Sequence, residues 1–254
     1  MQLHCRTYGN GHPLIILHGL FGSLNNWNSL SRKFGEHFKV YAVDQRNHGR
    51  SPHSDVFSYQ VMAEDLKEFM RHQGITTAHV LGHSMGGKTA MRFATSYPER
   101  VVRLIVVDIS PKAYDAKHDE MLKVMSSLHL DEFSTRKEVD AALSAEVQDT
   151  AVRHFLLTNL ARNDSGLFVW KLNLKAIRKN YGEINKGLSL ERVFTKPTLF
   201  VTGGKSTYIR KEDHHLIKKI FPHAKITTIS GAGHWVHAEA PGEFSRVVLD
   251  FLQE

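Results

Sequence analysis

The stretch that decides the fold runs Val80-Leu81-Gly82-His83-Ser84-Met85-Gly86-Gly87, with a Gly-x-Ser-x-Gly pattern between an apolar run and a helical pattern. A serine in such a strand-to-helix turn adopts a strained backbone conformation that holds its hydroxyl clear of the chain. Neighbouring backbone then passes so close that only glycine fits on either side. The N-terminus of the following helix favours negative charge that develops at the serine. We therefore expect Ser84 to be a nucleophile.

Apolar runs of similar length recur on both sides of this turn. Most are continuously apolar, which is typical of parallel strands that helices bury on both faces. They predict strands over residues 13–18, 39–44, 78–83, 102–108, 198–202 and 225–229, with a more alternating edge strand over 3–8. Amphipathic patterns predict helices over 58–73, 85–96, 216–220 and 241–252. This alternation predicts an α/β fold with a mostly parallel, doubly wound sheet.

The alternation of strands and helices stops after Pro111. Up to Lys196 the patterns predict no strand, only helices over 119–128, 136–147, 151–160 and 168–180. In the last of these, Lys171, Lys175 and Arg178 would share one helical face. We therefore expect an α/β core made of residues 1–110 and 197–254, with a helical cap of residues 111–196 inserted before the penultimate strand.

The expected general base is His234. It lies in the loop Ser230-Gly231-Ala232-Gly233-His234-Trp235, after the last predicted strand. Functional groups of α/β sheets gather at the carboxyl ends of the strands, where Ser84 also lies, and the order serine, acid, histidine leaves the histidine last. His237 is the nearest rival, and we expect it to face solvent or its own loop.

The sequence indicates the carboxylate that would partner His234 less directly. No carboxylate follows the strand predicted over 198–202, and Ser206 stands where an acid is expected. Asp108 ends the strand that follows the nucleophile's strand, from which it can reach the imidazole. We expect Asp108 to be the acid. The alternative is that Asp213 or Glu212 fills this role through a longer excursion of its loop.

Acyl transfer also needs two backbone N–H groups aimed at the oxygen that becomes charged. The residue after the nucleophile, Met85, supplies one of them. The loop after His18-Gly19 supplies the other, from Leu20 or alternatively from Phe21. Lys88 falls in the first turns of the same helix as Met85, where the helix dipole disfavours a cation, and the sequence offers no explanation for it.

The composition and the motifs that are missing further narrow the class of protein. The chain has 254 residues and a single cysteine, Cys5, so no internal disulfide can form. The N-terminus shows no secretory signal and the apolar runs are too short to span a membrane, so we expect a cytoplasmic protein. We expect no cofactor, no metal and no nucleic-acid partner, because no His-Glu-x-x-His motif, cysteine pair or nucleic-acid motif occurs.

The formal charge of +7 is concentrated in one region. Residues 153–196 hold nine basic residues (Arg153, Arg162, Lys171, Lys175, Arg178, Lys179, Lys186, Arg192 and Lys196) against three acids (Asp164, Glu183 and Glu191). Nearly the whole excess therefore lies in the predicted cap. A cationic rim of this kind would attract an anionic substrate, such as the phosphates of an acyl-CoA.

Five stretches carry a resemblance to a known family: HGLFGS at 18–23, DQRNHGRS at 44–51, GHSMGGK at 82–88, VDISP at 107–111 and GAGHWVHAE at 231–239. In these the chain resembles the α/β-hydrolase superfamily, and more closely the YbfF-type bacterial esterases. The resemblance implies Ser84, Asp108 and His234 as a catalytic triad. It also implies esterase or acyl-thioesterase activity without a cofactor, and it makes the helical insertion the cap of that fold.

The expected function is therefore a serine hydrolase that cleaves small acyl esters or thioesters through an acyl-enzyme on Ser84. One alternative is an acyl-CoA thioesterase selected by the basic cap. Carbon–carbon bond hydrolases and cofactor-free haloperoxidases use the same triad and stay open as alternatives. An alternative of another class is a non-catalytic binding protein on the same fold. The sequence carries no indication of an oligomeric state.

Overall fold

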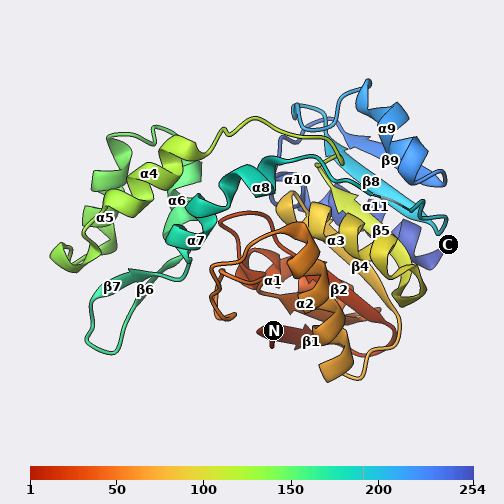
Figure 1. Ribbon diagram of the computed structural model, residues 1–254, viewed down its shortest axis with the longest axis horizontal. Helices are drawn as coiled ribbons and strands as arrows, with labels where there is room; N and C mark the ends of the chain where they lie inside the picture. Colours follow the sequence, from red (N-terminus) through yellow and green to blue (C-terminus); the bar gives the residue numbers. More distant parts are fainter. Residues whose placement is uncertain (191) are drawn as a thin grey trace.

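A seven-stranded sheet forms the centre of the computed structural model, which describes residues 1–190 and 192–254 (Figure 1). The strand order is β1-β3-β2-β4-β5-β8-β9. The bounds are β1 Cys5–Tyr8, β2 Pro13–Leu17, β3 Lys39–Val43, β4 Ala78–His83, β5 Val101–Val107, β8 Thr198–Gly203 and β9 Ala224–Ile229. Only β1 pairs antiparallel in this sheet, and the other pairings are parallel. The predicted α/β fold is confirmed.

Helices cover both faces of the sheet. On one face lie α2 (Tyr59–His72), α3 (Met85–Ser96) and α9 (Asp213–Ile220), and their apolar side chains share a core with Val80, Val106 and Phe200 of the strands. On the other face α1 (Asn28–Phe34) and α11 (Pro241–Gln253) pack over Leu81 and Val107. Successive strand residues thus enter opposite cores, which is why the strands are continuously apolar.

Shorter helical segments complete the chain outside the insertion. They are the 3-10 helices Leu24–Trp27 and Pro98–Arg100 and the short helix α10 (Val236–Glu239). Of the helices in the described part of the chain, none combines the length and apolar character that crossing a bilayer requires.

The helical elements between Pro111 and Leu190 lie to one side of the sheet (Figure 1). They are the helices α4 (Asp119–Ser127), α5 (Arg136–Ser144), α6 (Thr150–Leu157), α7 (Leu174–Lys179) and α8 (Tyr181–Asn185), and the 3-10 helix Leu130–Glu132. Their apolar side chains form a third core together with Phe21, Met62 and Met85 of the sheet-forming part. Glu191, one of the three acids counted in the basic stretch, lies outside the described residues.

The prediction of no strand in this segment is wrong. The strands β6 (Leu160–Arg162) and β7 (Phe168–Trp170) pair as an antiparallel hairpin where a helix over 168–180 was expected. The turn explains the difference, because the Asn163 side chain accepts hydrogen bonds from two backbone N–H groups and Gly166 adopts a φ of 80°. Asparagine and glycine in these conformations favour a turn over a helix. Helix α7 therefore starts only at Leu174, and Lys171 lies outside it.

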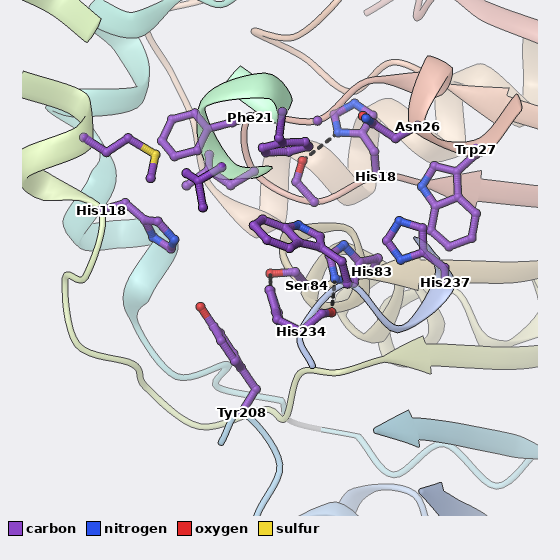
Figure 2. A pocket seen from close by; sticks show the side chains of 17 residues that line it. His18, Phe21, Asn26, Trp27, His83, Ser84, His118, Tyr208, His234 and His237 are labelled. Carbon is purple, nitrogen blue, oxygen red and sulfur yellow. Dashed lines mark hydrogen bonds between the residues drawn. The ribbon is translucent and has the colours of Figure 1, made fainter. Parts of the chain in front are cut away.

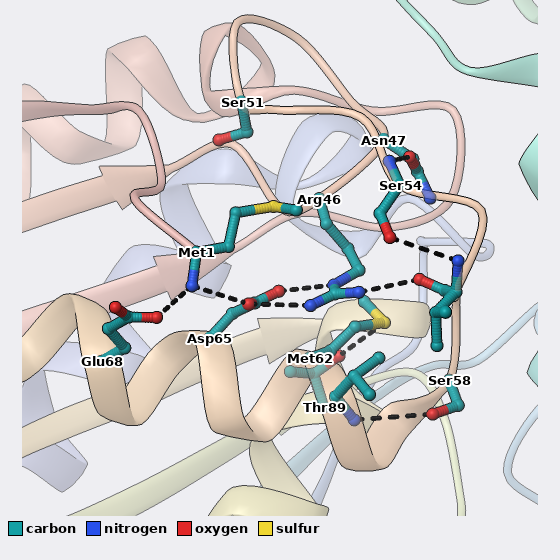
Figure 3. Close-up of polar contacts among 12 residues, drawn as sticks. Met1, Arg46, Asn47, Ser51, Ser54, Ser58, Met62, Asp65, Glu68 and Thr89 are labelled. Atoms are coloured by element: carbon teal, nitrogen blue, oxygen red, sulfur yellow. Dashed lines mark hydrogen bonds and ion pairs between the residues drawn. The ribbon is translucent and has the colours of Figure 1, made fainter.

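The loop that carries the 44–51 motif is anchored by buried charges (Figure 3). The Arg46 guanidinium forms a bidentate ion pair with the Asp65 carboxylate of α2, with N–O distances of 2.5 and 2.8 Å. The Met1 ammonium lies 3.2 Å from the same carboxylate. In this loop the carbonyl of Asn47 accepts a hydrogen bond from the Asn173 N–H at 3.0 Å. Asn173 is the N-cap of α7, so the anchored loop holds the N-terminus of that helix.

Candidate active site

Ser84 occupies the turn between β4 and α3 with a φ of 51°. A Cβ at Gly82 would lie 2.1 Å from the Gly86 oxygen, and a Cβ at Gly86 would lie 2.4 Å from the Leu17 oxygen. Both glycines are therefore required by close backbone approach, as the sequence predicts. The Ser84 N–H donates to the Val107 carbonyl at 3.0 Å, which ties the turn to the neighbouring strand β5.

The structure brings the three predicted residues Ser84, His234 and Asp108 together. The Ser84 Oγ lies 3.1 Å from His234 Nε2 (Figure 2). The Asp108 Oδ2 lies 2.7 Å from His234 Nδ1. A carboxylate only accepts hydrogen bonds, so Nδ1 carries the proton and Nε2 is the acceptor that faces the serine hydroxyl. This arrangement can remove a proton from Ser84.

Asp108 is fully buried, and its carboxylate accepts four hydrogen bonds. Its Oδ1 accepts from Thr202 Oγ1 at 2.9 Å and from the Gly203 N–H at 3.1 Å. Its Oδ2 accepts from the Ser206 hydroxyl as well as from His234. Ser206, which stands where the sequence leads one to expect an acid, instead donates to the acid on the neighbouring strand.

The alternative acids lie elsewhere. Asp213 Oδ2 accepts from Lys112 Nζ at 2.5 Å and from the Arg210 N–H at 2.8 Å, so its carboxylate is engaged at the start of α9. Glu212 is exposed at the same helix end. Within the described residues, neither carboxylate contacts His234.

One contact holds the His234 ring and another holds its backbone. It stacks on Tyr208 with a centroid separation of 3.8 Å and an angle of 16°. His83 Nε2–H donates to the His234 carbonyl at 3.0 Å (Figure 2). Burial raises the pKa of Tyr208 to about 12, so this phenol stays neutral beside the imidazole. The contacts leave the ring little freedom to turn away from Ser84.

The predicted oxyanion donors Leu20 and Met85 border the space in front of Ser84. Among the described residues, neither backbone N–H has a hydrogen-bond acceptor. The preceding Gly19 carbonyl accepts from the Gly22 N–H at 3.0 Å and from His18 Nδ1 at 2.8 Å. His18 Nε2 in turn accepts from the Gln45 N–H, and burial lowers the pKa of His18 to about 4, so the ring is a neutral support of this loop.

The expectation that His237 faces solvent or its loop is wrong. It lies in α10 and is buried, and its ring stacks on Trp27 with a centroid separation of 4.2 Å and an angle of 7°. The rings of His83 and Phe244 also lie next to it, with centroid separations of 4.6 and 6.3 Å. Burial lowers the pKa of His237 to about 3, so this histidine is a neutral packing element in the wall of the first pocket described below.

Two pockets meet at Ser84. The first has a volume of about 240 Å³ and is largely aromatic, with walls that include Phe21, Trp27, Phe155, Tyr208 and Trp235 (Figure 2). The second has a volume of about 60 Å³ and extends along α3 past Lys88, Tyr59 and Tyr114. An ester bound with its carbonyl at Ser84 can place its two ends in these two pockets.

The predicted cationic face of residues 168–180 is wrong in its geometry. Lys171 precedes α7 and lies in a surface hollow with Asp44 and Arg50, whereas Lys175 and Arg178 border an outer groove with Trp170 and Leu174. Neither surface includes Ser84. The hairpin that replaces the first part of the expected helix separates Lys171 from Lys175 and Arg178.

Sequence reasoning missed several residues that support the site. His18 and His83 lie inside the motifs that were used, so their positions were a usable indication of a supporting role. Tyr208 and the insertion residues His118 and Phe155 carry no comparable pattern, since only the tertiary structure brings them to the pocket.

The fold and this site define an α/β hydrolase, and comparison with known families agrees. The family model described as alpha/beta hydrolase fold matches residues 12–241. The chain therefore belongs to the α/β-hydrolase family.

Individual relatives are similar over nearly the whole chain. The protein named "sn-1-specific diacylglycerol lipase ABHD11" from Mus musculus is 40% identical over 247 residues, which cover 94% of this chain and 80% of the relative. "Esterase YbfF" from Escherichia coli is 33% identical over 258 residues, 100% of this chain and 99% of the relative. The solved structure titled "Marine microorganism esterase" has a TM-score of 0.97 and 44% identity and covers 99% of both chains. The resemblance to the YbfF-type esterases is confirmed.

Proposed function

We propose that the protein is a serine hydrolase that cleaves carboxylic esters of small molecules. The observation that carries the proposal is the hydrogen-bonded chain from Ser84 Oγ to His234 Nε2 and from His234 Nδ1 to Asp108, at 3.1 and 2.7 Å, at the junction of two pockets. Membership of the α/β-hydrolase family and the esterase and lipase names of the relatives support it.

The proposed reaction begins with attack of the Ser84 oxygen on the ester carbonyl as His234 Nε2 takes the hydroxyl proton. Asp108 stabilises the imidazolium that forms. The N–H groups of Met85 and Leu20 donate to the oxyanion. His234 then protonates the departing alcohol, which leaves the acyl group on Ser84. A water molecule, deprotonated by the same imidazole, hydrolyses this acyl-enzyme and releases the acid.

In this proposal residues 111–196 act as a cap over a core of residues 1–110 and 197–254. The cap supplies walls of the pockets, from His118, Met121, Val152 and Phe155 in the first and Ile184 in the second. The substrate is an acyl ester or thioester, and the reaction as written uses side chains, backbone N–H groups and water alone.

The test is a panel of aryl esters and acyl thioesters of graded chain length, assayed with wild type and Ser84→Ala. We expect Ser84→Ala to lower turnover by at least about 10⁴-fold. A fluorophosphonate probe should label wild type and an exposed-serine control, Ser127→Ala, but not Ser84→Ala. Retained activity in Ser84→Ala would refute the nucleophile.

The same panel separates the alternatives. A preference for thioesters over esters of the same acyl group would favour the thioesterase alternative. Turnover of carbon–carbon substrates or halide oxidation without ester hydrolysis would favour the related hydrolases and haloperoxidases. A folded wild-type protein with neither probe labelling nor turnover would favour a binding protein.

A further inference from the structure

Lys88 lies beside the triad but takes no part in the proposed mechanism. It stands on α3 four residues after Ser84, about one helical turn away. Only 1% of its surface is exposed. Its Nζ donates to the Lys186 carbonyl at 2.6 Å and lies 5.0 and 5.5 Å from the ring centroids of Tyr114 and Tyr59.

The charge of this ammonium is not balanced by a neighbouring acid. Within the described residues, no ion pair involves Lys88. An ammonium has three N–H donors, and one carbonyl uses only one of them. Burial lowers the pKa of Lys88 to about 8, so at pH 7 the group is still mainly protonated. A buried cation with this few partners is costly, and the nearby helix N-terminus adds to the cost.

The second pocket connects this cation with the reacting centre. Its wall includes Lys88 together with Ser84 and the two oxyanion donors, Leu20 and Met85. One bound molecule can therefore place a carbonyl at Ser84 and an anionic group at Lys88. A pocket of about 60 Å³ suits a compact group such as a carboxylate.

Other polar groups of this pocket are placed differently. Asp115 and Lys117 are exposed, and Tyr59 donates its hydroxyl to the Ile184 carbonyl at 2.8 Å. Burial lowers the pKa of His118 to about 4 and raises the pKa of both Tyr114 and Tyr208 to about 12. Near pH 7 these three rings are neutral, which leaves Lys88 as the buried charge among the residues that the structure describes there.

We propose that Lys88 binds a carboxylate carried by the substrate, so that this hydrolase prefers esters with a second, free acid group. The proposal rests on the proposed ester hydrolysis and names a substrate class for the same site. In the bound state the carboxylate accepts from Lys88 Nζ, and the pocket's length sets how many bonds separate it from the scissile carbonyl.

The test compares esters that differ only in whether they carry a free carboxylate. One series carries the carboxylate on the acyl side, as monoethyl esters of four- to six-carbon dicarboxylic acids. The other carries it on the alcohol side, as acetate esters of hydroxy acids. Each is paired with the neutral ester in which a carboxamide replaces the carboxylate. We expect wild type to favour the acid by kcat/KM about 10- to 100-fold in one series, the range of a buried charged hydrogen bond.

Lys88→Met should lower this acid-to-amide ratio by about the same factor. The matched control Lys219→Met removes an exposed lysine of α9 and should keep the wild-type ratio. The preference of wild type should also decline above about pH 8, as Lys88 loses its proton, which keeps the test available if Lys88→Met does not fold.

Equal kcat/KM for acid and amide in both series would overturn the proposal. A Lys88→Met variant that loses activity toward the acid-bearing and carboxamide-bearing esters alike would also overturn it. That result would mean that Lys88 stabilises the structure through its hydrogen bond to the Lys186 carbonyl. If wild type hydrolyses the ester bond of the carboxamide-bearing compounds through Ser84 without preferring the acids, only the carboxylate inference fails. If it hydrolyses no ester at all, the proposed function fails first.

Discussion

The two halves of the candidate active site are held by different forces. In the half built by the sheet, hydrogen bonds fix the functional atoms, and the Asp108 carboxylate alone accepts four. In the half built by residues 111–196, side chains such as Met121, Val152 and Phe155 line the first pocket through apolar contacts, which have no fixed direction. The sheet half suits bond chemistry, which needs close positioning. The insertion half suits selection of substrates by size and shape.

After loss of the proposed nucleophile itself, the largest expected effect comes from breaking the sheet half at its buried acid. Asp108→Asn keeps the size of the side chain but offers an N–H to the ring, which favours the wrong tautomer of His234. We expect kcat to fall by about 10³- to 10⁴-fold. Ser206→Ala removes only one of the four donors to Asp108 and should cost far less. Steady-state kinetics on one aryl ester gives both values, and the reverse ranking would move the acid elsewhere.

A second expected effect is on stability in acid. His18 supports the oxyanion loop as a neutral ring, and burial lowers its pKa to about 4. Between pH 6.5 and 4 the unfolded chain therefore binds more protons than the folded one, so this part of the stability is present above pH 6.5 and is lost as the pH falls. The full loss is about 3 kcal/mol.

Urea unfolding at pH 7.5 and pH 5 measures this loss. His18→Gln should unfold more easily at pH 7.5 but show a smaller change between the two pH values than wild type. His129→Gln, which replaces an exposed histidine of the insertion, should keep the wild-type change. An unaltered pH dependence in His18→Gln would show that the buried ring does not resist protonation.

The same contrast explains what the sequence could predict. Each strand of the large sheet was predicted to within two residues, because its apolar run reflects burial by both helical layers. Ser84, Asp108 and His234 could be expected to meet because all three follow parallel strands. The insertion was predicted less well. Its hairpin depends on the turn at Gly166. Outside the insertion, helix α1 was not predicted at all, since seven residues give too short a pattern.

Supporting residues were harder to predict than the triad. The contact of Tyr208 with His234 and the burial of His237 against Trp27 depend on long-range packing that no local pattern encodes. The sequence shows Lys88 only as an unfavourable charge near the start of a helix. The pocket that it lines together with Ser84 and Tyr114 is visible only in the structure.

A smaller effect is expected where the oxyanion loop approaches the nucleophile. A Cβ on Gly19 would lie 2.8 Å from His83 Nδ1 and 3.3 Å from Ser84 Cβ. Gly19→Ala must therefore shift the loop and with it the Leu20 N–H, and we expect kcat to fall by about 10- to 100-fold, less than for complete loss of a donor. Gly242→Ala, where a Cβ meets nothing within 4 Å, is the matched control and should keep full activity.

The smallest effect is expected in the insertion half, at Phe155. Its ring lines the first pocket, and its centroid lies 5.5 Å from that of the Trp235 ring. Phe155→Ala therefore enlarges the pocket without changing Ser84, His234 or Asp108. We expect kcat/KM for short acyl esters to fall by about three- to tenfold, mainly through KM, because burial of one partly exposed ring contributes to ground-state and transition-state binding alike. Leu167→Ala, at the exposed hairpin tip, should change neither constant. A loss in Phe155→Ala as large as that in Asp108→Asn would show that the insertion positions the reacting atoms, and the division of roles between the two halves would then be wrong.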